Sequence, residues 1–227
     1  MSLDILKAIN ELKNQRNAII VAHNYQDPLI QKLGDCVGDS FELAQKVKDV
    51  SCDIIVFAGA EFMAEMAAVL NSSKKVLITT SKAKCPMAEM LSPMEIKQYR
   101  QKYPNAAIAV YVNTTIETKA MADICVTSGN AVKVISQMKE DQILVGPDRN
   151  LAWFIQQQVP EKEIIPFPEV GHCYVHRKFQ LSDIEVLKAQ HPDAFVLVHP
   201  EADPQLQQVA DKIGSTSSMI AEAHSSI

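Results

Sequence analysis

Short apolar runs alternate with amphipathic stretches along the whole chain. The amphipathic stretches predict helices at 40–50, 61–70, 92–103, 130–138 and 181–190. The apolar runs predict buried strands at 18–24, 53–59, 75–80, 107–113, 143–147, 164–168 and 195–201. Alternation of this kind predicts an α/β fold with mostly parallel strands covered by helices.

The spacing of the strands reveals an internal repeat. His23, Tyr111 and His199 end the first, fourth and seventh predicted strands, and each lies 88 residues after the previous one. The same interval separates further matched residues, which are Asp35, Asp123 and Asp211, then Ser40, Ser128 and Thr216, and finally Pro104 and Pro192. The register holds without a gap, and internal repeats are typical of stacked or cyclic architectures.

The repeat predicts the domain organisation. Each copy contains three predicted strands, so we expect three-layer α/β/α units with parallel sheets around a pseudo-threefold axis. The first copy is predicted at 1–105 and the second at 106–193. The third copy begins at 194 and is incomplete at 227, so the sequence predicts a truncated third unit.

Composition and charge narrow the class of protein. The net charge of −5 gives no reason to expect nucleic acid or an anionic membrane as a partner. Residues 1–20 carry charges throughout, unlike a signal peptide, and no apolar run approaches the roughly 18 residues of a membrane span. Five cysteines is an odd number in a chain long enough to fold without disulfides, so reduced thiols in the cytoplasm are expected.

Two of the five cysteines follow the repeat. Cys85 and Cys173 are 88 residues apart, and each comes just after the third predicted strand of its copy, where α/β folds place ligand-binding loops. Extending the interval places a third cysteine at about position 261, beyond the 227 residues of the chain. Cys36, Cys52 and Cys125 do not match one another at this interval, so we interpret them as small core residues.

Matched cysteines on symmetry-related loops suggest a metal site. Three thiolates that converge on an axis suit a soft metal or an iron–sulfur cluster. Three ligands on a four-iron cluster leave one iron open as a Lewis acid toward substrate. Two alternatives stay open, namely buried thiols at Cys85 and Cys173, or zinc held by Cys173 with His172 or His176. Zinc is less favoured, because neither histidine has a matching histidine in the first copy.

Polar residues at the strand ends are the other candidates for chemistry. Matched positions in the three copies carry His23, Tyr25, Tyr111, Asn113, His199 and Glu201. Hydroxyl residues stand before the predicted helices that follow, namely Ser40, Ser128, Ser215 and Thr216. Helix N-capping is their expected role, and helix N-termini also bind anions, so three around one axis would suit a dicarboxylate or a phosphate.

With these residues in view, the chain resembles the quinolinate synthase family over essentially its full length. The motifs that carry the resemblance are "AHNYQ" (22–26), "VGDS" (37–40), "FMAE" (62–65), "CPMA" (85–88), "YVNT" (111–114), "DICVTSGNAVKV" (123–134), "PDRNLA" (147–152), "GHCYVH" (171–176), "VHPE" (198–201) and "GSTSSMI" (214–220). Together they are highly specific, although no single one would be.

The resemblance implies a fold, a cofactor and a reaction. It implies three α/β domains around a pseudo-threefold axis, with the active site at their junction and a [4Fe-4S] cluster held by three cysteines. The implied reaction condenses iminoaspartate with dihydroxyacetone phosphate to give quinolinate in NAD biosynthesis. An oxidase or dehydrogenase that supplies iminoaspartate is an expected partner. Ring closure needs repeated proton removal next to carbonyl or imine carbons, so a general base is required.

The resemblance also implies a role for each matched residue. Cys85 and Cys173 would be cluster ligands. The proton-transfer residues would be His199 and Glu201, with Tyr25 near the triose substrate and Tyr111 and Asn113 lining the pocket. Carboxylates would be bound by His23, Ser40 and Ser128, and phosphate or carboxylate by Ser215 and Thr216.

Two departures from the family pattern raise alternatives. Ala202 follows "HPE" where the family often has cysteine, which costs no ligand under the repeat. The family continues beyond the last residue and carries its third cluster cysteine there, so the third ligand is absent from these 227 residues. The alternatives are an inactive truncated relative that binds a small molecule or a partner, and a mononuclear zinc hydrolase.

Overall fold

A computed structural model describes residues 3–225 and has an α/β fold with parallel sheets. The chain divides into two compact units, which we call the N-terminal unit (Met1–Cys85) and the C-terminal unit (Pro86–Ile227). No described helix combines the length and the apolar character needed to cross a bilayer.

The N-terminal unit contains one parallel four-stranded sheet with the strand order β2-β1-β3-β4. Its strands are β1 (Ala18–His23), β2 (Cys36–Gly38), β3 (Ile54–Ala58) and β4 (Lys75–Ile78). Its helices are α1 (Leu3–Gln15), α2 (Pro28–Gln31), α3 (Ser40–Lys46), the 3-10 turn η1 (Val47–Asp49) and α4 (Glu61–Leu70). The core gathers apolar side chains of the two central strands, such as Val21, Ile55 and Phe57, against α3 and α4.

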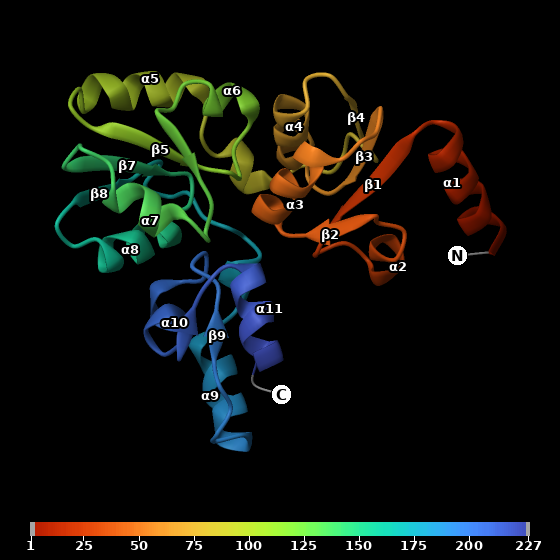
Figure 1. Ribbon diagram of the computed structural model, residues 1–227. Coiled ribbons are helices and arrows are strands. Elements are labelled where there is room, and N and C mark those ends of the chain that lie inside the picture. The colour runs from red at the N-terminus through yellow and green to blue at the C-terminus, as the bar shows by residue number, and fades with distance from the viewer. Residues whose placement is uncertain (1–2, 226–227) are drawn as a thin grey trace. The chain divides into compact units, whose positions relative to one another are not determined.

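The C-terminal unit contains a second parallel sheet with the equivalent order β6-β5-β7-β8. Its strands are β5 (Ala107–Tyr111), β6 (Ile124–Val126), β7 (Gln142–Gly146) and β8 (Glu163–Pro166). Its helices are η2 (Pro86–Glu89), α5 (Pro93–Lys102), α6 (Ile116–Lys119), α7 (Ala131–Ser136) and α8 (Arg149–Gln158). Helices α5 and α6 lie on one face of this sheet, and α7 and α8 lie on the other (Figure 1).

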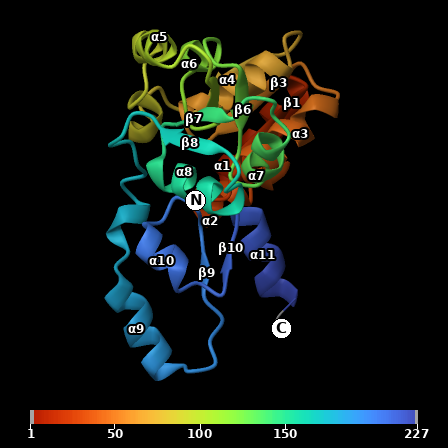
Figure 2. The same ribbon diagram turned by 90° about the vertical axis from the view of Figure 1, so that its left-hand side faces the viewer.

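A smaller third sheet completes the C-terminal unit. Strand β9 (Leu197–Val198) pairs in parallel with β10 (Lys212–Ile213). The surrounding helices are η3 (His176–Lys178), α9 (Leu181–Gln190), α10 (Pro204–Gln208) and α11 (Thr216–Ser225). Helices α10 and α11 flank the strand pair on opposite sides (Figure 2). Its small core consists of Val198, Ala202 and Leu206, with Leu181 and Ile184 of α9 packed against them.

One hydrogen-bond pattern recurs in all three sheets at the 88-residue interval. In each, an aspartate just before the outer strand accepts a hydrogen bond from a main-chain N–H of the first central strand or the residue preceding it. The bonds are Ile20 N to Asp35 Oδ2 (2.7 Å), Ile108 N to Asp123 Oδ2 (2.8 Å) and Val196 N to Asp211 Oδ2 (2.7 Å). A cation on the preceding helix pairs with each aspartate, namely Lys13, Arg100 and Lys188. The matched aspartates therefore position the outer strand in each copy.

The predicted elements are present, but the predicted count of strands per copy is wrong. All seven predicted strands and all five predicted helices occur within a few residues of their expected bounds. Each full sheet has four strands and not three, because β2 and β6 were missed, as was β10 in the third. These strands have only two or three residues, too few for an apolar run to stand out. The predicted boundaries at 105/106 and 193/194 stay predictions.

Candidate functional site

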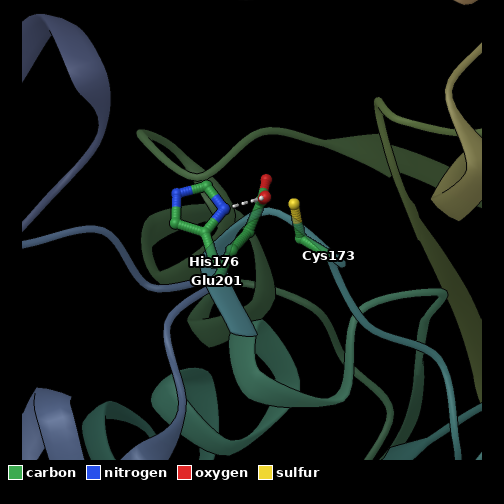
Figure 3. A group of neighbouring side chains, drawn as sticks. All are labelled: Cys173, His176 and Glu201. Carbon is green, nitrogen blue, oxygen red and sulfur yellow. Dashed lines mark ion pairs between the residues drawn. The ribbon is translucent and has the colours of Figure 1, made fainter. Parts of the chain in front are cut away.

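The loop after β8 carries Cys173 at the start of the candidate site. Its main-chain N–H donates to Asp148 Oδ2 over 3.0 Å, so the loop is anchored next to the first turn of α8. The thiol is partly buried and forms no disulfide. Three residues later the chain enters η3 with His176, and both its imidazole and the Cys173 thiol lie next to the Glu201 carboxylate (Figure 3).

Glu201 is the centre of the site. It follows β9, and its side chain is buried, with 4% of the residue exposed. Tyr111, the last residue of β5, donates its hydroxyl to Glu201 Oε1 over 2.6 Å. The other carboxylate oxygen, Oε2, lies 3.0 Å from His176 Nδ1. A phenol and an imidazole therefore approach the same carboxylate from two different elements.

Cys173, His176 and Glu201 could together hold a metal ion. One donor atom from each lies within 4.8 Å of the others, and Figure 3 shows the thiol and the imidazole directed toward the carboxylate. The buried Nδ1 of His176 lies 3.0 Å from Glu201 Oε2, in an ion-pair contact that helps to raise the pKa of the imidazole. A buried nitrogen next to a thiol and a carboxylate fits a metal, and the thiolate favours a soft one.

The charges of Glu201, His176 and Tyr111 influence one another. Burial disfavours the charged form of Glu201, but contacts with His176, His199 and Tyr111 outweigh it and lower the pKa of Glu201 to about 2. Burial also opposes charge on His176, yet Cys173 and Glu201 raise the pKa of His176 to about 10. Burial and the adjacent carboxylate raise the pKa of Tyr111 well above its usual value. The site therefore contains a carboxylate (Glu201) in contact with an imidazolium (His176) and a neutral phenol (Tyr111).

His199 links Glu201 to the loop after β6. The Glu201 N–H donates to His199 Nδ1 over 3.2 Å, so neutral His199 carries its proton on Nε2. That nitrogen lies 3.3 Å from Ser128 Oγ, to which it can donate. The His199 ring also stacks on His176, with 5.0 Å between ring centroids. Hydrogen bonds thus connect Ser128 to His199 and His199 to the main chain of Glu201.

The structure brings together several predicted site residues and places others elsewhere. Tyr111, Ser128, Cys173, His199 and Glu201 lie in one connected cluster of the C-terminal unit. Ser215 approaches the same loop, because a Cβ on Gly129 would lie 3.5 Å from Ser215 Oγ. Asn113 follows β5, and Thr216 begins α11. The remaining predicted residues belong to the N-terminal unit, namely His23, Tyr25, Ser40 and Cys85.

His23 and Tyr25 repeat part of this geometry in the N-terminal unit. The Tyr25 N–H donates to His23 Nδ1 over 3.2 Å. The Glu201 N–H donates to His199 Nδ1 in the same way, two 88-residue intervals further along the chain. The two rings meet edge to face with 4.7 Å between centroids. His23 is 5% exposed, whereas Tyr25 is 63% exposed. The phenol of Tyr25 therefore stands outside the core of its unit, where a ligand could reach it.

The capping prediction is correct for one serine and wrong for two. Ser215 Oγ accepts from Ser218 N over 3.3 Å at the start of α11. At α3 the acceptor is Asp39, which takes the Glu42 N–H over 2.9 Å, because α3 already begins at Ser40. Ser128 stands two residues before Asn130, the N-cap of α7, and contacts His199 instead. Ser128 is thus more available for ligand binding than capping would have allowed.

The five cysteines separate into two groups, as predicted. Cys52 belongs to the core of the N-terminal unit, and Cys36 packs against the same core. Cys125 packs against the core of the second sheet. Cys85 and Cys173 lie outside these cores, each in the loop that follows the last strand of its sheet.

Sequence reasoning underestimated His176 and missed Asp148. His176 was considered only as a zinc ligand, and its counterpart 88 residues earlier is Ala88. Asp148 is completely buried and its counterpart is Ala60. Burial and the charge of Glu201 raise the pKa of Asp148 well above its usual value, while backbone N–H groups oppose this. Matching residues at the 88-residue interval identifies only positions that recur. Residues that occur in one copy alone, such as His176 and Asp148, are not identified by it.

Parallel sheets whose carboxyl ends gather a thiol, an imidazole, a carboxylate and a phenol are typical of an α/β enzyme with a metal-binding site. The sequence model of the family described as "Quinolinate synthetase A protein" matches residues 7–227. The chain belongs to the quinolinate synthase family.

Curated relatives named quinolinate synthase are similar along nearly the whole chain. The relative from Methanocaldococcus jannaschii is 51% identical over 221 residues, which are 97% of this chain and 72% of the relative. The relative from Pyrococcus furiosus is 52% identical with the same coverage. The relative from Alkaliphilus metalliredigens is 43% identical over 98% of this chain and 73% of its own length. The chain thus spans a little under three quarters of these relatives.

Proposed function

We propose that the protein acts as a quinolinate synthase, condensing iminoaspartate with dihydroxyacetone phosphate to form quinolinate for NAD biosynthesis. The observation that carries this proposal is the identity of about half of all residues to curated quinolinate synthases over 97% of the chain. The buried Tyr111–Glu201–His176 contacts support it, since the condensation requires repeated proton transfers.

The cofactor we propose is a [4Fe-4S] cluster held by Cys85, Cys173 and a third cysteine at the next 88-residue interval, about position 261. Cys173 meets the requirement for a soft, accessible thiolate next to a carboxylate and an imidazole. When bound, such a cluster supplies an open iron that acts as a Lewis acid toward substrate oxygen or nitrogen. His176 and Glu201 would then border the cluster ligand.

We further propose that three α/β units surround a pseudo-threefold axis and share one active site. The recurring aspartate bonds of the three sheets support this arrangement, since they show the same local construction at each interval. In it, His23, Tyr25 and Ser40 would meet residues of the C-terminal unit such as Ser128. The predicted copies at 1–105, 106–193 and from 194 onward are the units of this proposal.

The proposed division of labour follows the local geometry. Glu201 would take protons next to an imine or carbonyl, because its buried carboxylate accepts a hydrogen bond from Tyr111 and lies in contact with His176. His199, with its proton on Nε2, can donate through or beside Ser128. Asn113 would line the pocket. Ser215 and Thr216, at the start of α11, offer hydroxyls and main-chain N–H groups to phosphate or carboxylate.

An activity assay with metal analysis tests the proposal. The protein is prepared anaerobically in two forms, the 227-residue chain and a chimaera that extends it with the C-terminal part of the Methanocaldococcus jannaschii relative. We expect the chimaera to contain about four irons with matching sulfide and to form quinolinate from iminoaspartate and dihydroxyacetone phosphate. Stoichiometric zinc without sulfide would indicate a mononuclear site on Cys173, His176 and Glu201. A protein with neither metal nor turnover would be the inactive binding relative.

A further inference from the structure

The first turn of α8 is tied to the cysteine loop by one buried carboxylate. Asp148 is the N-cap residue, and its Oδ1 accepts from Leu151 N over 2.7 Å. Its second oxygen, Oδ2, accepts from Cys173 N over 3.0 Å. Asp148 is 0% exposed, so its side chain has no contact with solvent. A single side chain therefore joins the start of the helix to the main chain of Cys173.

The same turn touches the cysteine loop through its main chain. Arg149 N donates to Gly171 O over 2.9 Å. A Cβ on Gly171 would lie 1.8 Å from Pro147 O, a distance that no side chain tolerates. The loop therefore runs against the turn as closely as glycine alone permits. Together with Asp148, these contacts fix the path of the chain into Cys173.

The opposite side of the turn holds the loop of Glu201. Asn150 Nδ2 donates both to Glu201 O and to Asp203 Oδ1, each over 3.0 Å. Gln207 Nε2 shares its two hydrogens among Asn150 O (3.3 Å), Pro200 O (2.9 Å) and Ala202 O (2.8 Å). Asn150 and Gln207 are 1% and 2% exposed. The carbonyls around Glu201 are therefore satisfied by two buried amides, Asn150 on α8 and Gln207 on α10.

We propose that Asp148, Asn150 and Gln207, which we call the α8 clasp, are positioning residues that fix Cys173 and Glu201 relative to each other. Cys173 and Glu201 both lie in loops, so no strand or helix fixes either residue at its own position. Side chains that bond to the main chain of a metal ligand help to set the geometry of the metal site, as the ligands themselves do. This inference rests on the proposed function only in taking Cys173 and Glu201 as working groups.

Helix capping alone does not account for the clasp. A cap requires one acceptor oxygen, and serine or threonine supplies it. The equivalent helix of the N-terminal unit, α4, begins after Ala60 and has no side-chain cap at all. The repeated fold therefore does not need a carboxylate at this position. The second oxygen of Asp148 has its own partner, and that partner is the Cys173 N–H.

The rate of Cys173 alkylation tests the clasp in the metal-free 227-residue chain. The variant Asp148→Ser keeps a capping oxygen for Leu151 N but removes the acceptor of Cys173 N. Iodoacetamide is applied, and mass spectrometry reports the rates at Cys173 and at Cys125, the internal reference packed on the core of the same unit. We expect the Cys173-to-Cys125 ratio to change by about tenfold, the effect of losing one strong hydrogen bond.

A matched control separates positioning from stability. Ser92 Oγ caps α5 by accepting from Glu95 N, so Ser92→Ala removes a cap of the same unit without touching the site. We expect Ser92→Ala to lower the melting temperature and leave the alkylation ratio unchanged. An unchanged ratio in Asp148→Ser, or an equal change in Ser92→Ala, would overturn the positioning role. Should Asp148→Ser fail to fold, Asp148→Asn carries the same test, because its amide keeps only one acceptor oxygen.

Iron retention provides the second readout in the extended chimaera. Loss of a residue that orients a metal ligand typically lowers metal affinity by about 10- to 100-fold. We therefore expect a chelator to remove iron from Asp148→Ser at least about tenfold faster than from the parent. If the parent itself takes up no iron, the proposed cluster fails, while the alkylation ratio of the metal-free chain still decides the role of the clasp.

Discussion

The loops that carry Cys85 and Cys173 occupy equivalent places in the two full sheets, yet they are built differently. Each loop follows the last strand of its sheet, and each is bonded to the start of the equivalent helix by the same main-chain contact. Glu61 N donates to Ala83 O over 2.7 Å in one, and Arg149 N donates to Gly171 O over 2.9 Å in the other. The backbone frame is therefore common to both.

The side chains around the two loops differ. The residue before α4 is Ala60, whereas the residue before α8 is Asp148, which bonds Cys173 N. Near Cys85, Lys84 instead lies 3.6 Å from Glu61 in a partly exposed ion pair. Such an exposed pair contributes little stability. Repetition therefore supplies the scaffold, while residues found in one copy alone build the chemical environment of the cysteine.

The largest expected effect comes from removing either cysteine. In the extended chimaera, Cys85→Ser and Cys173→Ser should each abolish cluster assembly, because the proposed cluster needs both thiolates despite their different loops. Iron and sulfide analysis after anaerobic reconstitution measures this. Cys36→Ser is the control and should cost only stability, since Cys36 packs against the core. Full iron content in Cys85→Ser with none in Cys173→Ser would mean that only one loop binds metal.

Glu201→Gln should separate chemistry from metal binding. The amide keeps the size of the side chain but loses the charge that makes it a base, so turnover should fall by about 10²- to 10⁴-fold. Iron content should remain that of the parent. Glu140→Gln, on an exposed residue of the same unit, is the matched control. Normal turnover in Glu201→Gln would remove Glu201 from the mechanism.

Asn150→Asp probes the side of the clasp that has no equivalent in α4. A carboxylate would replace an amide that donates to Glu201 O and to Asp203, leaving acceptors facing one another. We expect a loss of about 2 kcal/mol in the free energy of unfolding, measured with denaturant. Asn130→Asp is the control, because Asn130 uses its oxygen to accept from Thr127 N and the substitution keeps that oxygen. Equal effects of the two substitutions would contradict the assigned contacts.

The smallest expected effect is a gain. Ala60→Asp gives α4 the capping residue that α8 already has, and Ala60 has the extended backbone typical of an N-cap. Denaturant unfolding should report a stabilisation of about 0.5–1 kcal/mol. A destabilised variant would show that positions 60 and 148 are not structurally equivalent, which would weaken the comparison of the two loops.

Much of the fold could be predicted from the sequence, because long apolar runs and an unbroken 88-residue interval are one-dimensional signals. The interval selected Cys85 and Cys173, and it selected His199 and Tyr111 at strand ends. The short outer strands were not found. A strand of two or three residues has no recognisable period, and its position is set by an aspartate such as Asp123 that bonds a distant strand.

The α8 clasp could not be predicted in the same way. The partners of Asp148 and Gln207 include main-chain atoms 25 and 57 residues away, and only the folded chain brings them together. Almost every residue type offers the same main-chain N–H and C=O groups, so the sequence does not show which residue is the partner. Ser128 illustrates the same limit, because its place before a helix predicted a cap, whereas folding places it against His199.

We propose that Cys85 and Cys173, from two equivalent loops, hold one iron–sulfur cluster. A crystal structure of the reconstituted chimaera, with anomalous scattering recorded at the iron edge, tests it most directly. We predict one compact iron peak in bonding contact with the sulfur atoms of both cysteines. A metal bound by Cys173, His176 and Glu201 alone, with the sulfur of Cys85 remote from it, would contradict the account.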